Sequence, residues 1–407
     1  MPFNRTKTGV AVGLLVLLLA ATSFGQGPLG MQLFAPADVS TFGGAPRPNE
    51  GYFFSFDGLY WSIQKPNVAP IGSPIPRSVD GSVVNVINAL GNYIVPTRAN
   101  GGIGFYDQLS SQDTTPLIND FQTGERYEFG RVEDNHGWMV SIFRMRVDEQ
   151  DFIGHQAGVS LADPNDLLFG RIGEALWTVP PRPAPGATDT TILVDGYLPV
   201  VFDSIQVSNT TDMWGVEASY LRRMMTFHNG GNLEWYLGAR YFEFNENFGV
   251  IATGGALDGT NWMTCALNHI VGPQIGAHYF KQQGRWMFST EGRFLAGYNT
   301  QNLSQQGTFY TGTPGDVGQP LAWSGNSFSS SSVLHEFTPL VELRVEARYL
   351  ITRTISFRAG WTGVWMDGIA RPQGMVKYEV PNMGIDASNN RQNLLLTGLH
   401  LGIDFNR

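Results

Sequence analysis

Cysteine and charged residues are both scarce in this sequence. Cys265 is the only cysteine among 407 residues, which excludes an intrachain disulfide, a multi-cysteine metal cluster and a lipid-anchoring cysteine just after an export signal. Charged residues make up 15% of the chain, and the formal net charge is −9. Nucleic-acid-binding proteins carry a basic stripe, so this balance argues against a nucleic-acid partner.

Long apolar runs are also missing, apart from one at the start of the chain. Arg5 and Lys7 precede an apolar run from Val10 to Ala20, and small residues at Ser23 and Gly25 follow it. The run is shorter than the ~20 residues of a membrane helix and fits a secretory signal peptide better. The sequence therefore predicts a signal peptide over 1–25, cleaved before Gln26, with an uncleaved anchor as the alternative. Residues 26–50, rich in Pro and Gly, are predicted to be a flexible lead-in.

Signatures of catalysis are absent as well. The sequence contains no G-x-S-x-G, no P-loop and no EF-hand series, and its seven His residues are scattered. His335-Glu336 lacks the second His of the H-E-x-x-H zinc motif. We therefore predict that the protein is not an enzyme, with no catalytic residue, no cofactor and no metal site.

Aromatic residues and two-residue alternation, by contrast, are abundant. The chain has 26 Phe, 14 Tyr and 10 Trp, and its clearest pattern lies between Pro339 and Met366. There Val341, Leu343 and Val345 alternate with charged residues, and a second run resumes after Arg353. Each run keeps phase for about eleven residues, longer than the five or six of a typical soluble strand and long enough for a tilted transmembrane strand. The pattern is typical of a strand with one lipid-facing and one lumen-facing side.

Alternating runs of this kind recur along the chain. Seven strands are predicted from Asp212 onward and three before it, and two more between 150 and 210 would raise the total from ten to twelve. The predicted connections alternate between short (226–232, 281–284 and 351–353) and long (246–261, 299–337 and 367–390). Outer-membrane barrels have short periplasmic turns and longer extracellular loops. The predicted fold is all-β: a single antiparallel up-and-down transmembrane β-barrel of about ten to twelve strands over 51–407, with long extracellular loops.

A set of charged residues shares the phase opposite to the apolar positions. This parity predicts a charged lumen lining made of Glu217, Arg240, Glu291, Arg293, Glu342, Arg344, Glu346, Arg348 and Arg358. Unpaired charges in a narrow space are costly, so neighbouring Glu and Arg should pair across strands. The set predicts either a lumen filled by ion-paired side chains or a narrow charged lining that selects solutes.

Several segments are similar to a known family, the planctomycete outer-membrane proteins grouped as β-barrel porin type seven. The segments are MWGVEASY (Met213 to Tyr220), YLGARYFEF (Tyr236 to Phe244), the G-x-Q-x-G of Gly272 to Gly276, GRWMFSTEGRFLAGYN (Gly284 to Asn299), PLVELRVEARYLITRTISFRAGW (Pro339 to Trp361), the Arg371-Pro372 pair and GLHLGIDF (Gly398 to Phe405). The resemblance implies an outer-membrane barrel in an envelope of Gram-negative type and implies no particular substrate.

These inferences predict a porin-like protein of the cell outer membrane, exported through a cleaved signal peptide. Its partners would be outer-membrane lipid and, as candidates, small solutes, and its role either limited solute passage or a structural, surface-presenting one. The sequence does not determine the oligomeric state. The alternative is a soluble secreted β-sandwich that binds a ligand or a glycan, with the apolar strand faces turned inward.

Overall fold

A computed structural model of the chain describes residues 50–73, 86–87, 93–94, 112–162, 197–309 and 326–406, apart from positions 225, 229, 255–257, 380 and 381. The predicted signal peptide (1–25) and nearly all of the predicted lead-in (26–50) lie outside these residues. Within the described residues, no helix has the length and apolar character needed to span a bilayer.

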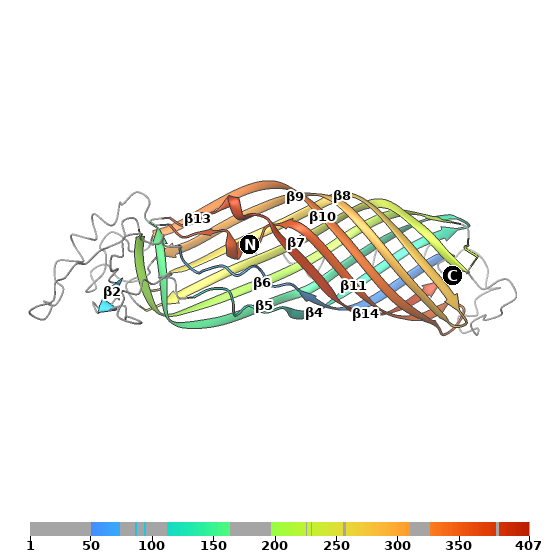
Figure 1. Ribbon diagram of the computed structural model, residues 1–407, viewed down its shortest axis with the longest axis horizontal. Helices are drawn as coiled ribbons and strands as arrows, with labels where there is room; N and C mark the ends of the chain where they lie inside the picture. Colours follow the sequence, from blue (N-terminus) through green and yellow to red (C-terminus); the bar gives the residue numbers. More distant parts are fainter. Residues whose placement is uncertain are drawn as a thin grey trace, which may run out of the picture.

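The described residues form a closed antiparallel β-barrel (Figure 1). Its strands are β1 (Gly51–Ile63), β4 (Asp120–Glu133), β5 (His136–Ala162), β6 (Tyr197–Arg223), β7 (Gly231–Thr253), β8 (Asn261–Gln283), β9 (Trp286–Phe309), β10 (Asn326–Leu350), β11 (Ile355–Ile369) and β14 (Gln392–Asn406). Strand β1 pairs with β14 on one side and with β4 on the other, which closes the ring. The predicted all-β, up-and-down barrel is confirmed, at the lower strand number of ten for the described part of the chain.

The strands have two lengths. β5 to β10 contain 23 to 27 residues, whereas β1, β4, β11 and β14 contain 13 to 15. All ten enclose one end of the barrel, and the six long strands continue past it as a curved sheet, seen at the left of Figure 1. We call this continuation the tall wall; it comprises residues 148–162, 197–212, 243–253, 261–269, 300–309 and 326–335.

The tall wall corrects several expected boundaries. Residues 150–162 and 197–211 extend β5 and β6 and are not separate strands. The predicted loops 246–261 and 299–337 are largely strand, since only 254–260 and 310–325 separate the strands there. The prediction was wrong because the outward side chains of the wall are hydroxyls and amides, such as Ser304 and Gln306 on β9. Strands that meet water on their outer side show no apolar alternation.

The outer face of the ring is apolar. Trp235, Leu343 and Trp361 are 45%, 43% and 39% exposed, and they point away from the barrel interior. The same face carries many other exposed apolar side chains, among them Val271, Ile275, Phe288, Phe294, Val341, Val345, Phe357, Leu399, Leu401 and Ile403. The soluble sandwich required these faces to be buried, so that alternative is wrong.

The apolar face is a band with sharp limits. On β7 the outward residues are apolar from Leu233 to Tyr241, and then become polar at Glu243 and Asn245. Aromatic pairs mark both limits: the rings of Trp214 and Tyr241 lie 5.2 Å apart on the wall side, and those of Trp286 and Tyr349 lie 5.0 Å apart on the opposite side. Aromatic girdles flanking an apolar band are typical of transmembrane barrels.

The strands are joined by tight turns at the end opposite the tall wall. Only Asp134 and Asn135 separate β4 from β5, and Asp134 has a positive φ of 49°. Only Gly284 and Arg285 separate β8 from β9, and Gly284 has a φ of 63°. A left-handed backbone conformation is common in such hairpins, and Gly and Asp tolerate it better than most residues. The short connections predicted near 281–284 and 351–353 are confirmed.

Candidate functional site: the filled lumen

The nine predicted lumen residues all lie on inward-facing positions and are buried. Their exposed fractions range from 2% for Arg358 to 7% for Glu291 and Glu346. They come from β6 (Glu217), β7 (Arg240), β9 (Glu291 and Arg293), β10 (Glu342, Arg344, Glu346 and Arg348) and β11 (Arg358). The closed ring brings these strands around one axis, and every one of the nine takes part in an ion pair.

Some of these ion pairs cross the lumen. Arg344 on β10 donates to Glu128 on β4 over 2.9 Å, and Arg358 on β11 donates to the other oxygen of Glu128 over 3.0 Å. In the ring order, β11, β14 and β1 separate β10 from β4. The two guanidinium groups therefore reach the carboxylate through the barrel interior, not along the wall.

Other pairs join strands that are three places apart in the ring, or lie within one strand. Arg240 donates to Glu342 over 2.5 Å, and Glu342 also accepts from Arg344 over 3.0 Å. Arg293 is bonded to both Glu217 and Glu291. Every one of these carboxylates has at least one guanidinium partner, which is what burial of a charge requires.

Five further residues of the network were not predicted. They are Asp57 on β1, Arg126 and Glu128 on β4, and His400 and Asp404 on β14. Asp57 is fully buried and accepts a hydrogen bond from Arg126 over 2.7 Å, while Asp404 forms an ion pair with Arg348 over 2.8 Å. The alternation in the last strand already puts His400 and Asp404 on the polar side. In β1 both faces are rich in aromatics, so its sequence gives no comparable signal.

The network is nearly neutral and closely packed. It joins seven carboxylates (Asp57, Glu128, Glu217, Glu291, Glu342, Glu346 and Asp404) to six guanidinium groups (Arg126, Arg240, Arg293, Arg344, Arg348 and Arg358). The cavity between Arg126, Glu217 and Arg344 measures about 10 Å³. A single water needs about 10–15 Å³, so this space does not hold a water-filled passage.

An apolar layer lies next to the network, toward the tall wall. Inward residues of most strands form it, including Phe143 on β5, Phe242 on β7, Leu295 on β9 and Leu340 on β10. These side chains are at most 5% exposed. Arg240 contacts this layer directly, with its guanidinium carbon 5.8 Å from the centre of the Phe143 ring. The lumen is thus closed by a polar layer and an apolar layer in series.

The connection between β11 and β14 closes the wide opening inside the tall wall. We call residues 370–391 the plug; it contains two short 3₁₀ turns, η1 (Pro372–Gly374) and η2 (Ala387–Asn389), and the ribbon of β12 (Val376–Lys377) with β13 (Gly384–Ile385). The sequence predicted a long loop over 367–390. This connection instead folds back over the barrel opening, where Tyr378 and Met383 pack on apolar residues of the wall.

Arg371 fixes the plug to the wall. It is 1% exposed and donates two hydrogen bonds, of 2.7 and 2.8 Å, to the Glu246 carboxylate on β7 and one of 2.7 Å to the Gln64 carbonyl. Gln373 donates to Glu246 over 2.9 Å. Burial by itself raises the pKa of Glu246, but the Arg371 charge and these hydrogen bonds outweigh it and lower the pKa. Glu246 lies beyond the apolar band, between the outward residues Asn245 and Asn247.

One hydrogen-bonded chain in the lumen has the residue order of a nucleophilic site. Thr362 Oγ1 lies 3.2 Å from His400 Nδ1, and His400 Nε2 lies 3.1 Å from Glu346. Thr362 and His400 are each only 1% exposed, so a substrate cannot reach the hydroxyl in this arrangement. The chain is a packed part of the network. Among the described residues, no group of three His, Cys, Asp or Glu side chains could hold a metal ion.

These features define a class of protein: a transmembrane β-barrel with a girdled apolar band and a filled, ion-paired lumen. Comparison with protein families identifies the family to which this barrel belongs. The model of the family described as "Putative beta barrel porin-7" matches residues 97–406, which is most of the chain. The chain belongs to this family and is a porin-like protein of the outer membrane.

Comparison with solved structures finds other outer-membrane proteins. The outer membrane protease OmpT from Escherichia coli is 8% identical, with a TM-score of 0.36 and coverage of 88% of this chain and 97% of that one. The Pseudomonas putida toluene transporter TodX is 10% identical, with a TM-score of 0.27 and coverage of 92% and 93%. A Pseudomonas aeruginosa FadL homologue is 7% identical, with a TM-score of 0.22 and coverage of 92% and 95%. No conclusion about function follows from similarities this low. Comparison with curated proteins gave no match.

Proposed function

We propose that this porin-family barrel is closed at rest and serves mainly to hold its tall wall at the cell surface, with solute passage limited to rearranged states. The observation that carries the proposal is the bridge across the lumen, in which Arg344 and Arg358 share the Glu128 carboxylate. In this reading the nine predicted residues act with Asp57, Arg126 and Glu128 to hold the lumen shut. Because the charges of the lining are paired and nearly cancel, the lining attracts neither anions nor cations into the lumen.

The proposed orientation places the tall wall outside the cell. The tight turns lie at the opposite end, together with the start of β1 at Gly51 and the end of β14 at Asn406. Short turns and chain ends on the periplasmic side are usual for outer-membrane barrels. We also propose that residues 1–25 are a cleaved export signal, that 26–50 link it to the barrel, and that the envelope is of planctomycete type. The mass of the purified protein tests the first point: a chain beginning at Gln26 is expected, and one retaining Met1 would contradict cleavage.

Conductance in planar bilayers tests the closed lumen. The wild-type protein is expected to give no steady single-channel steps. The five-fold variant Glu128→Ala, Arg344→Ala, Arg358→Ala, Phe143→Ala, Phe242→Ala removes the bridge across the lumen and opens the apolar layer next to it, and is expected to let small ions leak through. Val345→Ala, an outward neighbour of Arg344, is the control and should remain closed.

Two results would contradict the proposal. The first is a wild-type protein that conducts in steady steps which disappear on replacing Arg344 and Arg348, because those arginines would then line an open pore. The second is a five-fold variant that migrates as a folded, heat-sensitive barrel on gels and yet conducts no more than the wild type. We further predict that the protein has no catalytic activity and needs no cofactor.

A further inference from the structure

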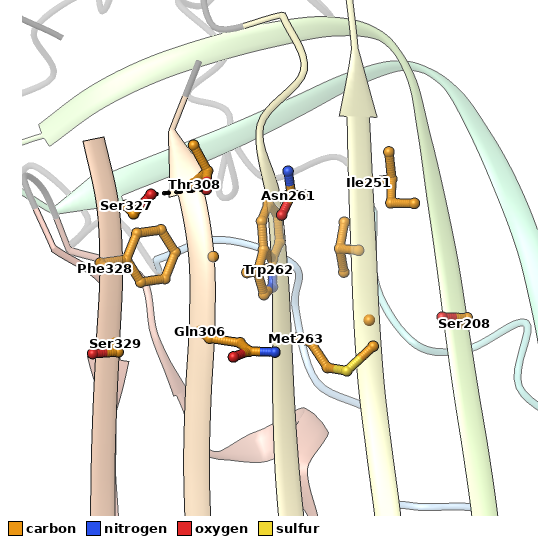
Figure 2. Close-up of a pocket in the computed structure, with 13 residues that line it drawn as sticks. Ser208, Ile251, Asn261, Trp262, Met263, Gln306, Thr308, Ser327, Phe328 and Ser329 are labelled. Atoms are coloured by element: carbon orange, nitrogen blue, oxygen red, sulfur yellow. Dashed lines mark hydrogen bonds between the residues drawn. The ribbon is translucent and has the colours of Figure 1, made fainter. Parts of the chain in front are cut away.

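The outer surface of the tall wall carries a groove of about 580 Å³, which lies outside the lumen described above (Figure 2). It runs across β6, β7, β8, β9 and β10, near the far end of the wall. The height of the groove above the membrane follows from Gly249, one of its lining residues. Gly249 lies eight residues beyond Tyr241, which marks the limit of the apolar band. For a strand that rises ~3.3 Å per residue and tilts about 40°, this distance is roughly 20 Å above the bilayer.

One rung of paired residues forms the floor of the groove. Ser208, Gly249, Met263, Gln306 and Ser329 are direct neighbours across the five strands. Gly249 lies between Ser208 and Met263 in this rung and adds no side chain to the floor. A Cβ there would lie 2.8 Å from Ser208 Oγ and 3.8 Å from the Met263 methyl group, so a larger side chain would displace the hydroxyl. Figure 2 shows the side chains of Met263 and Gln306 extending along the rung on the same side of the sheet.

The next rung adds a second row of neutral groups. Ile251, Asn261, Thr308 and Ser327 are neighbours in register, and the hydroxyls of Thr308 and Ser327 lie 3.3 Å apart. The Asn261 amide donates to the Gly259 carbonyl over 3.3 Å, which leaves its oxygen to accept. Within the described part of the chain, the Gln306 side chain has no hydrogen-bond partner.

The chemistry of the two rungs favours one class of ligand. The amides of Asn261 and Gln306 can each donate and accept, which suits paired hydroxyls on adjacent carbons. Ile251 and Met263 are 52% and 43% exposed and offer apolar contact to the C–H face of a sugar ring. Sulfur and aliphatic carbon adapt easily to such surfaces. The groove therefore combines hydroxyl recognition with a small apolar patch.

Charge excludes the main competitor, an anionic polymer or phosphate. None of the residues in the two rungs is charged. The closest charges on the same face are acidic: Asp151 on β5 is paired with Ser208, and Glu149 is one rung nearer the membrane, paired with Thr210. An anionic ligand would meet these carboxylates without a compensating cation.

We infer that this groove is a binding site for a neutral saccharide chain at the cell surface. The inference goes beyond the proposed function, from which it takes only the outward orientation of the wall. Binding from solution does not depend on that orientation or on the state of the lumen, so the two can fail separately.

Titration of the detergent-solubilised full chain with soluble oligosaccharides tests the inference. Two neutral probes, maltoheptaose and a linear mannan hexasaccharide, are compared with an anionic one, oligogalacturonate. The wild-type protein is expected to bind at least one neutral probe at least about tenfold more tightly than the anionic one, a difference of about 1.4 kcal/mol. Gly249→Trp covers the floor of the groove with an indole ring, and the double variant Asn261→Ala, Gln306→Ala removes the amides; each should weaken neutral-probe binding by about tenfold or more.

Asn302→Trp provides the matched control, because Asn302 also points outward on β9 but lies two rungs below the groove. It should bind the neutral probe like the wild type. The inference is overturned if the wild type binds neither neutral probe, if it prefers the anionic probe, or if both groove variants bind as tightly as the wild type. Heat-dependent gel migration verifies that each variant is folded, and the double alanine variant decides the matter if Gly249→Trp does not fold.

Discussion

Asp57 and Arg358 meet directly above Gly402. Both residues are paired with Gly402 in register, Asp57 from β1 and Arg358 from β11, with β14 between them. Arg358 donates two hydrogen bonds of 2.6 Å to the carboxylate, which is fully buried. A Cβ at position 402 would lie 2.0 Å from an Asp57 oxygen, so the ion pair requires a glycine at this point.

This contact predicts the effect of a single added side chain. Gly402→Val should separate Asp57 from Arg358 and leave buried charges poorly paired, at a cost of about 3–5 kcal/mol in unfolding free energy. Urea unfolding in detergent micelles measures the change. Gly58→Ala is the matched control on the lipid-facing side, where the nearest atom to a new Cβ is 3.8 Å away, and it should have little effect. Equal stability of the two variants would show that the pair contributes nothing to the fold.

The plug and the lumen network act as two barriers in series. Replacing residues 371–389 by a short Gly-Ser linker should therefore leave the protein non-conducting, because the apolar layer and the charged network remain in place. Combining this deletion with the five-fold variant Glu128→Ala, Arg344→Ala, Arg358→Ala, Phe143→Ala, Phe242→Ala should give a larger conductance than the five-fold variant alone. Single-channel recording separates the cases, and steady steps from the plug deletion by itself would show that the network is open.

Attachment of the plug should depend on acid pH. Because the pKa of Glu246 is lower in the folded protein than its ordinary value of about 4.3, the Arg371–Glu246 pair contributes fully above that value. Its contribution disappears as the pH falls through the lower, folded-state pKa. Hydrogen exchange of the plug should thus be constant from pH 5 to 8, after correction for intrinsic rates, and accelerate below about 4.

Two variants distinguish this cause from general acid unfolding. Glu246→Gln should expose the plug to exchange at neutral pH and remove the acid-induced change in this segment. Arg371→Ala should weaken the plug further, by about 3 kcal/mol, because it leaves a buried carboxylate without its charged partner. A plug in Glu246→Gln that keeps both wild-type protection and wild-type acid sensitivity would assign the effect to other groups.

The apolar band predicts how the protein inserts into lipid. Leu343 points outward in the band, so Leu343→Arg should destabilise the membrane-inserted barrel by up to about 2–4 kcal/mol. Asn302→Arg, on the water-facing wall, should have almost no effect. Folding yield into lipid vesicles, read from gel migration with and without heating, compares them. Equal yields would argue that position 343 does not contact hydrocarbon.

Much of the ring was predictable because two-residue alternation acts locally. Between Pro339 and Met366, each residue's face follows from its parity, so Leu343 was placed outside and Arg344 inside before any contact was known. The tall wall was not predictable in this way. Ser304, Gln306 and Ser329 face water while inward partners such as Leu303 are buried, and hydroxyl-rich strands resemble loops in sequence.

The sequence by itself determined the strand faces of the ring, the scarcity of cysteine and the parity of the charged residues, because these depend only on residue type and spacing. The tertiary structure decided which charges meet. Asp57 and Arg358 are separated by 301 positions in the sequence, and Glu128 and Arg344 by 216. Each pair meets only because the ring closes around one axis. The tertiary structure also decided that the connection after β11 folds into the barrel opening, since Arg371 finds Glu246 from a distant strand. Such pairings depend on how the barrel closes and on the register between its strands, and neither can be read from the local sequence.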